Sequence, residues 1–258
     1  MKLPVLSIYF YRSRFPECIV ITILTVLALT AVVGTGQAGQ PAIHARKVIV
    51  LDPGHGGHDT GAGSSNDIYE KNVNMAFARI LADKLKATYK VRFTRADDYW
   101  VDLAHRPAVA NNIEADLFLS IHTGACLLHN PGGMLIAYYD SRFWIADRNG
   151  PKAVDSPGSK DLLPAWDEES PVHAEKSHYL AELLKKKFLE YDPEINIDIQ
   201  GMPLLVLQGA DLPALLIEIG YLTNPADLQN LQSDTKLAEY ADIILTTLDA
   251  YFSDELDL

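Results

Sequence analysis

The segment Val48-Ile-Val-Leu-Asp-Pro-Gly-His-Gly-Gly57 joins an apolar, mostly β-branched run to a glycine-rich loop that carries a histidine. A short apolar run without alternating polar residues is typical of a strand that is buried on both faces of a sheet. Further along the chain, similar runs alternate with stretches in which apolar residues recur at helical spacing. This alternation predicts an α/β fold, with a mostly parallel sheet and helices on both of its faces.

Residues 47–254 are expected to form a single domain, because no internal repeat or low-complexity linker interrupts them. Strands are expected at residues 48–51, 91–94, 117–121, 134–139, 203–207 and 214–218. Helices are expected at about residues 70–85, 102–113, 174–188 and 235–252. The stretch 141–172 is rich in Pro, Gly and charged residues and has no regular period, so we interpret it as a loop insertion within the domain.

The first forty residues have a different character from the rest. Lys2, Arg12 and Arg14 precede the apolar run Cys18–Val33, and small residues follow that run as far as Ala38. A basic start, a short apolar run and small residues predict a secretory signal at residues 1–38, with a short linker at residues 39–46. The run is shorter than the roughly 20 apolar residues of a spanning helix, so we expect an exported protein without a permanent membrane anchor.

Composition excludes some classes of function. The 258 residues include 34 acidic and 22 basic side chains, which give a formal net charge of −12. This excess of acid argues against a general nucleic-acid binder, because neutralising phosphates requires clustered Lys and Arg. Without the signal, Cys126 is the only cysteine of the chain, so we expect no internal disulfide and interpret Cys126 as a small buried residue.

Three polar residues lie at the ends of predicted strands. His55 follows the strand at 48–51, His122 follows the strand at 117–121, and Glu218 ends the strand at 214–218. Ligands of open α/β sheets bind in the crevice at the carboxyl ends of the strands. If these strands are parallel neighbours, the three side chains converge at one edge of the sheet.

Two imidazoles and a carboxylate are the donor set of a catalytic zinc site, which keeps a fourth position for water. A second carboxylate is then needed to carry a proton from the water to the leaving group. Glu70 and Glu218 can fill these two roles, and the residue pattern does not decide which takes which. His58 and Asp59 are alternative ligands in the glycine-rich loop, whose glycines would let the backbone pass close to a bound ion.

The order and spacing of several motifs resemble the zinc-dependent N-acetylmuramoyl-L-alanine amidases of the type 3 family. These motifs are Val50–Gly57, Glu70-Lys71, Arg106–Asn111, Ala115–His122 and Pro213–Pro225. The resemblance covers about residues 47–252. It implies a six-stranded sheet flanked by helices, and hydrolysis of the amide that joins N-acetylmuramic acid to L-alanine in peptidoglycan.

The resemblance also implies the roles of the site residues. His55, Glu70 and His122 would hold one zinc ion, and Glu218 would be the catalytic carboxylate. The substrate would be peptidoglycan in the periplasm or cell envelope. An activating partner protein is compatible with the resemblance, but nothing in the sequence identifies one.

Two regions depart from the family pattern and carry the expected substrate contacts. Thr123-Gly-Ala125 stands where the family usually has Ala followed by Asn or Asp, and Thr123 is a candidate substrate contact. In some relatives a helix inserted in the region of residues 141–172 plugs the cleft until a partner removes it. The Pro- and Gly-rich sequence here instead predicts a groove wall, with Trp166 and His173 as candidate substrate contacts.

Two other functions share most of these features. A zinc peptidase that cuts within the stem peptide would use the same metal chemistry. A degenerate, non-catalytic homologue that binds the envelope would have lost a ligand or the base, whereas all four residues are present here.

Overall fold

The computed structural model describes residues 46–64, 67–125, 132–140 and 171–254. The chain divides between Ala45 and Arg46, and the fold described below is that of the second unit. The signal predicted at residues 1–38, Cys126 and Trp166 lie outside the described residues, as do nearly all of the linker and of the insertion. Within the described residues, no helix is both long enough and apolar enough to cross a membrane.

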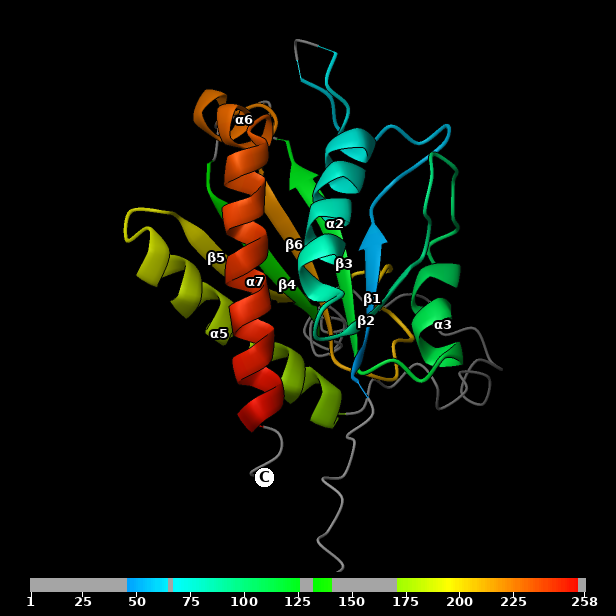
Figure 1. Cartoon of the computed structure of the whole chain (residues 1–258). Coiled ribbons are helices and arrows are strands. Elements are labelled where there is room, and N and C mark those ends of the chain that lie inside the picture. Colours follow the sequence, from blue (N-terminus) through cyan, green and yellow to red (C-terminus); the bar gives the residue numbers. More distant parts are fainter. Residues whose placement is uncertain (1–45, 65–66, 126–131, 141–170, 255–258) are drawn as a thin grey trace, which may run out of the picture. The chain divides into compact units, whose positions relative to one another are not determined.

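A six-stranded sheet forms the centre of this unit (Figure 1). The strands are β1 (Val48–Pro53), β2 (Lys90–Phe93), β3 (Leu117–Gly124), β4 (Met134–Tyr139), β5 (Ile197–Met202) and β6 (Ala214–Tyr221). Their order across the sheet is β2-β1-β3-β6-β4-β5. Neighbouring strands are parallel except for β4 and β6, which are antiparallel. The predicted α/β fold with a mostly parallel sheet is confirmed.

Helices cover the two faces of the sheet unequally. One face packs against α2 (Glu70–Leu85), α5 (Pro171–Tyr191) and α7 (Asp234–Asp254). The other face packs against α3 (His105–Asn112) and the segment at residues 203–213, which is not helical. The short helix α6 (Pro225–Leu231) follows β6 and contacts α7.

The apolar strands supply both cores by simple alternation. In β1, Ile49 and Leu51 join the core under α2, α5 and α7, whereas Val50 between them joins the core under α3. In β6, Ile217 and Leu216 divide in the same way. A strand that is buried on both faces needs apolar residues at every position, which explains the continuous runs seen in the sequence.

One expectation about local structure was wrong, and two elements, β5 and α6, were not predicted. No strand forms at residues 203–207, where residues 205–209 make turns, and the edge strand β5 precedes them. Pro203 cannot donate a hydrogen bond to a ladder, and Val206 and Leu207 are buried by packing on the sheet rather than by pairing within it. Helix α6 was not predicted, although Asn224 caps it by accepting hydrogen bonds from two backbone N–H groups.

The topology brings three strand ends together. Strand β3 lies between β1 and β6, and all three run in the same direction. The register pairs His122 of β3 with Glu218 of β6. The carboxyl ends of these three interior strands therefore lie together along one end of the sheet, as the sequence predicted.

Candidate metal and catalytic site

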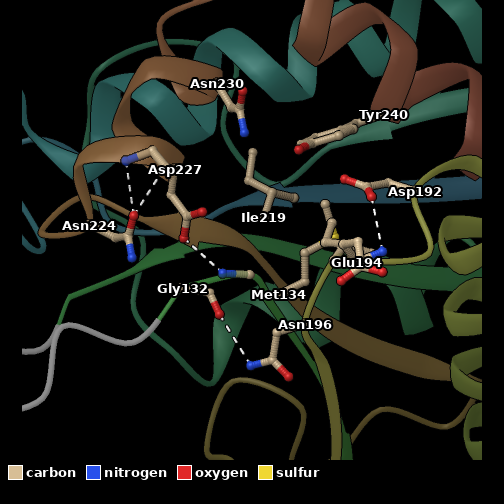
Figure 2. Close-up of a pocket in the computed structure, with 13 residues that line it drawn as sticks. Gly132, Met134, Asp192, Glu194, Asn196, Ile219, Asn224, Asp227, Asn230 and Tyr240 are labelled. Atoms are coloured by element: carbon tan, nitrogen blue, oxygen red, sulfur yellow. Dashed lines mark hydrogen bonds between the residues drawn. The ribbon is translucent and has the colours of Figure 1, made fainter.

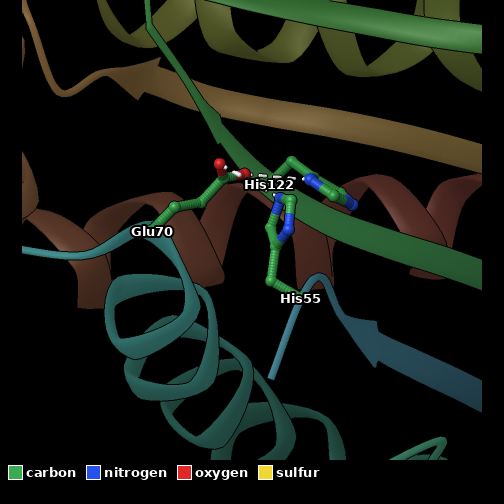
Figure 3. A group of neighbouring side chains, drawn as sticks. All are labelled: His55, Glu70 and His122. Carbon is green, nitrogen blue, oxygen red and sulfur yellow. Dashed lines mark hydrogen bonds and ion pairs between the residues drawn. The ribbon is translucent and has the colours of Figure 1, made fainter. Parts of the chain in front are cut away.

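Three potential metal ligands meet at this edge (Figure 3). His55 lies in the loop after β1, His122 lies in β3, and Glu70 is the first residue of α2. The carboxylate of Glu70 lies between the two rings, 3.1 Å from His55 Nε2 and 2.9 Å from His122 Nδ1. One donor atom from each residue lies within 4.8 Å of the other two, so a single ion can contact all three.

Glu70 is buried and held by the backbone around it. Its carboxylate accepts hydrogen bonds from the N–H groups of Ala62, at 2.9 Å, and of Thr123, at 3.1 Å. Burial alone would raise the pKa of Glu70, but hydrogen bonds from His122 and His55 hold this pKa well below its usual range. The carboxylate is therefore a fixed negative charge in the physiological pH range.

His55 is oriented by a carboxylate on its far side. Its Nδ1 lies 2.8 Å from Asp59 Oδ2, and an N–H that donates to this carboxylate leaves the lone pair of Nε2 facing Glu70. Two acceptors at 3.1 Å repel each other unless a proton or a metal ion lies between them. Burial lowers the pKa of His55, but the hydrogen bonds and charges of Glu70 and Asp59 outweigh it and raise the pKa. Two imidazoles and one carboxylate fit a divalent ion such as zinc.

The two alternative ligands in the loop have other positions. Asp59 contacts the outer nitrogen of His55 and so supports that ligand from behind. His58 is exposed, and its ring lies 5.4 Å from the ring of Trp100.

Two glycines make room for the ligands. A Cβ atom at Gly54 would lie 2.3 Å from His122 Nε2, and a Cβ atom at Gly61 would lie 2.6 Å from Glu70 Oε2. Gly61 also has a φ of 63°, which favours glycine. Both glycines bring the backbone close to the side chains of candidate ligands, and their approach to a bound ion stays a prediction.

Glu218 lies beside the three ligands but outside their group. Burial raises the pKa of Glu218 above its usual value, with the charge of Glu70 adding to this and His122 opposing it. A Cβ atom added at Gly124 would lie 2.7 Å from Glu218 Oε2 and would also contact the ring of Tyr221. Any larger residue at position 124 would displace this carboxylate, which explains a glycine after Thr123.

Two buried arginines hold the loop that carries His55. Arg95 donates to the carbonyls of Pro53 and Gly54, and also to the carbonyl of Lys71 in the first turn of α2. Arg106 donates to the carbonyls of Pro53 and His55 and pairs with the buried carboxylate of Asp52 at 2.8 Å. Sequence reasoning missed this role of both arginines, because no short pattern separates a buried arginine from an exposed one.

These contacts matter because the loop is strained. His55 has a φ of 61°, in the left-handed region that non-glycine residues adopt at a cost of about 1–3 kcal/mol. The arginines bind carbonyls on both sides of this peptide unit and connect it to the helix that begins with Glu70. They therefore position two of the three ligands relative to each other.

A cleft of about 570 Å³ opens beside His55 and His122, and neither Glu70 nor Glu218 is among the described residues that line it. His55, Asp59, Arg106 and His122 line one part of it, residues 100–103 form one wall, and residues 203–206 form another. Trp100, Leu103 and Leu205 are each about half exposed on these walls. Trp100 was not predicted as a functional residue. It lies six residues before the motif segment Arg106–Asn111, and this proximity could have indicated a place near the site.

Two of the three expected substrate contacts are not among the described residues that line the cleft. Trp166 is outside the described residues. His173 lies near the start of α5, and its Nε2 is 3.4 Å from Asp211 Oδ1. Asp211 comes just before the first residue of β6, whereas Glu218 lies towards the other end of that strand. Thr123 is buried, and its backbone N–H supports Glu70. Among the described residues that line the cleft, neither His173 nor Thr123 is present.

Comparison with known proteins gives consistent matches. The family model described as N-acetylmuramoyl-L-alanine amidase matches residues 49–250. The N-acetylmuramoyl-L-alanine amidase AmiC of Neisseria meningitidis is 29% identical over 235 residues, which are 85% of this chain and 56% of that protein. A probable cell wall amidase, LytH of Staphylococcus epidermidis, is 32% identical over 212 residues, which are 80% of this chain and 59% of that protein. The chain thus spans somewhat more than half the length of these relatives.

A solved structure has the same fold. The crystal structure of an N-acetylmuramoyl-L-alanine amidase from Clostridium difficile 630 superposes with a TM-score of 0.63 at 27% identity. The superposition covers 80% of this chain and 97% of that one.

The fit of His122 against the loop predicts the effect of Gly54→Ala. The added methyl group must displace the His122 ring, so we expect the affinity for Zn²⁺ to fall at least about tenfold in a chelator competition assay. Gly63→Ala is the matched control, because the nearest atom to its Cβ lies 3.6 Å away. Equal zinc affinity in the two variants would contradict the predicted packing.

The arginine contacts predict the effect of Arg95→Lys. The guanidinium of Arg95 spans four carbonyls on different segments, which the single ammonium nitrogen of a lysine cannot reach together, so we expect zinc affinity to fall about 10- to 100-fold. Arg79→Lys, at an exposed arginine that contacts Asp97, should bind zinc like the unmodified chain. Circular dichroism should show both variants folded at the temperature of the assay; an unchanged affinity in Arg95→Lys would rule out the positioning role.

Proposed function

Because the chain belongs to the type 3 N-acetylmuramoyl-L-alanine amidase family, we propose that it hydrolyses the amide between N-acetylmuramic acid and L-alanine in peptidoglycan, with one bound Zn²⁺. The observation that carries this proposal is the group formed by His55, Glu70 and His122, with Glu218 on the neighbouring strand. This arrangement combines a metal site with a separate carboxylate, which metal-assisted hydrolysis of an amide requires.

The ligands and the carboxylate have different roles in this proposal. His55, Glu70 and His122 hold the ion, which supplies a Lewis acid that polarises the scissile carbonyl and acidifies water. Glu218 accepts a proton from the attacking water as the new carbon–oxygen bond forms. It then delivers that proton to the departing nitrogen of L-alanine as the carbon–nitrogen bond breaks.

The surroundings of Glu218 suit a group that takes up and releases a proton. Burial and the charge of Glu70 raise the pKa of Glu218, which makes it a stronger base than an exposed glutamate. The ring of Tyr221 and the glycine at position 124 define where its carboxylate lies. Glu70 differs because its pKa is lowered, so it remains charged and suits a ligand.

The cleft supports a substrate larger than a simple amide. Its volume of about 570 Å³ extends from His55 and His122 between two walls that carry exposed apolar side chains, among them Trp100 and Leu205. The flat face of a tryptophan can cover the apolar face of a sugar or a peptide side chain. Export through the predicted signal at residues 1–38 would bring this cleft to peptidoglycan in the periplasm or cell envelope.

One experiment tests both which bond is cleaved and whether Glu218 is the proton acceptor, by comparing the unmodified chain with Glu218→Gln. The full chain loaded with zinc should release stem peptides that begin with L-alanine from intact glycan strands, as detected by mass spectrometry. The substitution removes the proton acceptor and should slow this release at least about 100-fold while zinc content stays the same. Cleavage between residues of the stem peptide would instead indicate a peptidase, and activity of Glu218→Gln close to that of the unmodified chain would exclude the proposed base.

The cleft wall predicts the effect of Trp100→Ala. Because this contact would form equally in the bound substrate and in the transition state, we expect KM for soluble peptidoglycan fragments to rise about tenfold with little change in kcat. Tyr99→Ala is the control, since Tyr99 has the same exposure of 47% but is not among the residues that line the cleft. A KM that is unaffected by Trp100→Ala would remove Trp100 from the substrate site.

A further inference from the structure

A second pocket lies on the face of β6 opposite Glu218. Figure 2 shows the residues that line it. The pocket has a volume of about 260 Å³ and lies between the loop at residues 192–196, the start of β4, the end of β6, and helices α6 and α7. Successive residues of a strand face opposite sides of the sheet. Ile219 therefore lines this pocket, whereas the preceding residue, Glu218, lies beside the metal ligands.

The pocket is acidic and contains no basic side chain. Asp192, Glu194 and Asp227 line it, and none of the described lining residues is Lys, Arg or His. Asp227 is fixed in place because its Oδ2 accepts hydrogen bonds from the backbone N–H groups of Gly133, at 2.9 Å, and Tyr221, at 3.0 Å. The charges of the lining residues therefore favour a positively charged ligand.

Tyr240 places a polar group without a partner in the same pocket. The residue is 5% exposed, and in the described part of the chain its hydroxyl group makes no hydrogen bond. Figure 2 shows the hydroxyl end of the ring turned towards the interior of the pocket. Burial raises the pKa of Tyr240 to about 12, with Tyr191, Asp227 and Asp192 contributing to the increase. The hydroxyl group is therefore neutral and can accept a hydrogen bond from a cation.

The base of the pocket is apolar. Met134 and Ile219 are each 2% exposed, and the ring of Tyr240 lies beside them. The only described group in which three carboxylate, imidazole or thiol donors converge within 4.8 Å is the one at the proposed zinc site. These features favour an organic cation over a metal.

We propose that this pocket binds a primary alkylammonium group, with its alkyl chain against Met134 and Ile219 and its ammonium group hydrogen-bonded to Tyr240 Oη. The acidic side chains of Asp227, Asp192 and Glu194 surround the positive charge. Such a group occurs on free diamines and on lysine-type side chains of peptides. The site does not depend on the proposed amidase activity, since it is separated from the metal ligands by β6.

The pocket is tested by titrating the full chain with three ligands while following the backbone amide signals of Gly133 and Asn196 by NMR. The ligands are cadaverine, Nα-acetyl-lysine methylamide, and the same lysine derivative with its ε-amine acetylated. We expect the first two to shift these signals and the acetylated derivative to leave them unchanged. Shifts with cadaverine alone would identify free diamines as the ligand, and shifts with both would include peptide-borne amines. Equal binding of the acetylated derivative, or binding by none of the three, would overturn the proposal.

Two variants examine the roles of the residues. Tyr240→Phe removes only the hydroxyl group and should weaken cadaverine binding about tenfold, because a hydrogen bond to a charged group is lost. Glu194→Gln removes a charge at the exposed rim and should weaken binding about two- to threefold. Glu182→Gln, at an acidic residue of α5 outside the pocket, is the matched control and should bind like the unmodified chain.

Thermal stability separates a binding role of Tyr240 from a structural one. The hydroxyl group of Tyr240 faces the pocket and makes no hydrogen bond to the described residues, so Tyr240→Phe removes no internal contact and should have a Tm equal to or higher than that of the unmodified chain. Unchanged cadaverine binding in Tyr240→Phe would contradict the proposal. A lower Tm together with unchanged binding would show that the hydroxyl group serves the fold instead.

Discussion

The site depends on the contacts that the buried carboxylate of Glu70 makes with His55 and His122. The two oxygens of this carboxylate face imidazoles from two different strand ends, and the same oxygens accept backbone hydrogen bonds from the loop before α2 and from β3. A buried charge without such partners would be costly. The folded chain therefore stabilises this charge only when β1, β3 and α2 are all in place, which couples assembly of the sheet to assembly of the ligand group.

A second buried carboxylate, that of Asp52, fixes Arg106 and through it the loop that carries His55. Asp52 is fully buried at the end of β1, and Arg106, Ser120 and Thr94 satisfy its oxygens. Breaking a buried pair of this kind typically costs about 3–5 kcal/mol, so Arg106 has little freedom to move. Its remaining donors can then hold the strained backbone at His55. The geometry of the ligands thus comes from charges that are paired well inside the fold.

The parts of this arrangement that depend on strand ends could be predicted from the sequence. Apolar runs locate β1, β3 and β6, and a polar residue after each run indicates the edge at which they converge. The roles of Glu70 and Glu218 could not be separated in this way, because they depend on which carboxylate lies between the two rings. Trp100 and Arg95 were missed because their positions follow from a loop path that has no periodic pattern. The edge strand β5 was missed because polar residues alternate with its apolar ones, whereas the apolar run at residues 204–207 has the pattern of a buried strand.

Strand β6 constrains both sites at once. Glu218 lies on the side of the metal ligands and Ile219 lines the acidic pocket, so a shift in register of one residue would exchange their faces. The pairing of β3 with β6 is regular up to His122 and Glu218 and becomes irregular before Gly124 and Tyr221. Gly220, with a φ of 148°, falls within this irregular part. The strand is therefore regular where the register must bring Glu218 beside His122. The strand departs from regular pairing just beyond Glu218. There the ring of Tyr221 lies beside the carboxylate of Glu218, and the backbone N–H of Tyr221 donates to Asp227 of the second pocket.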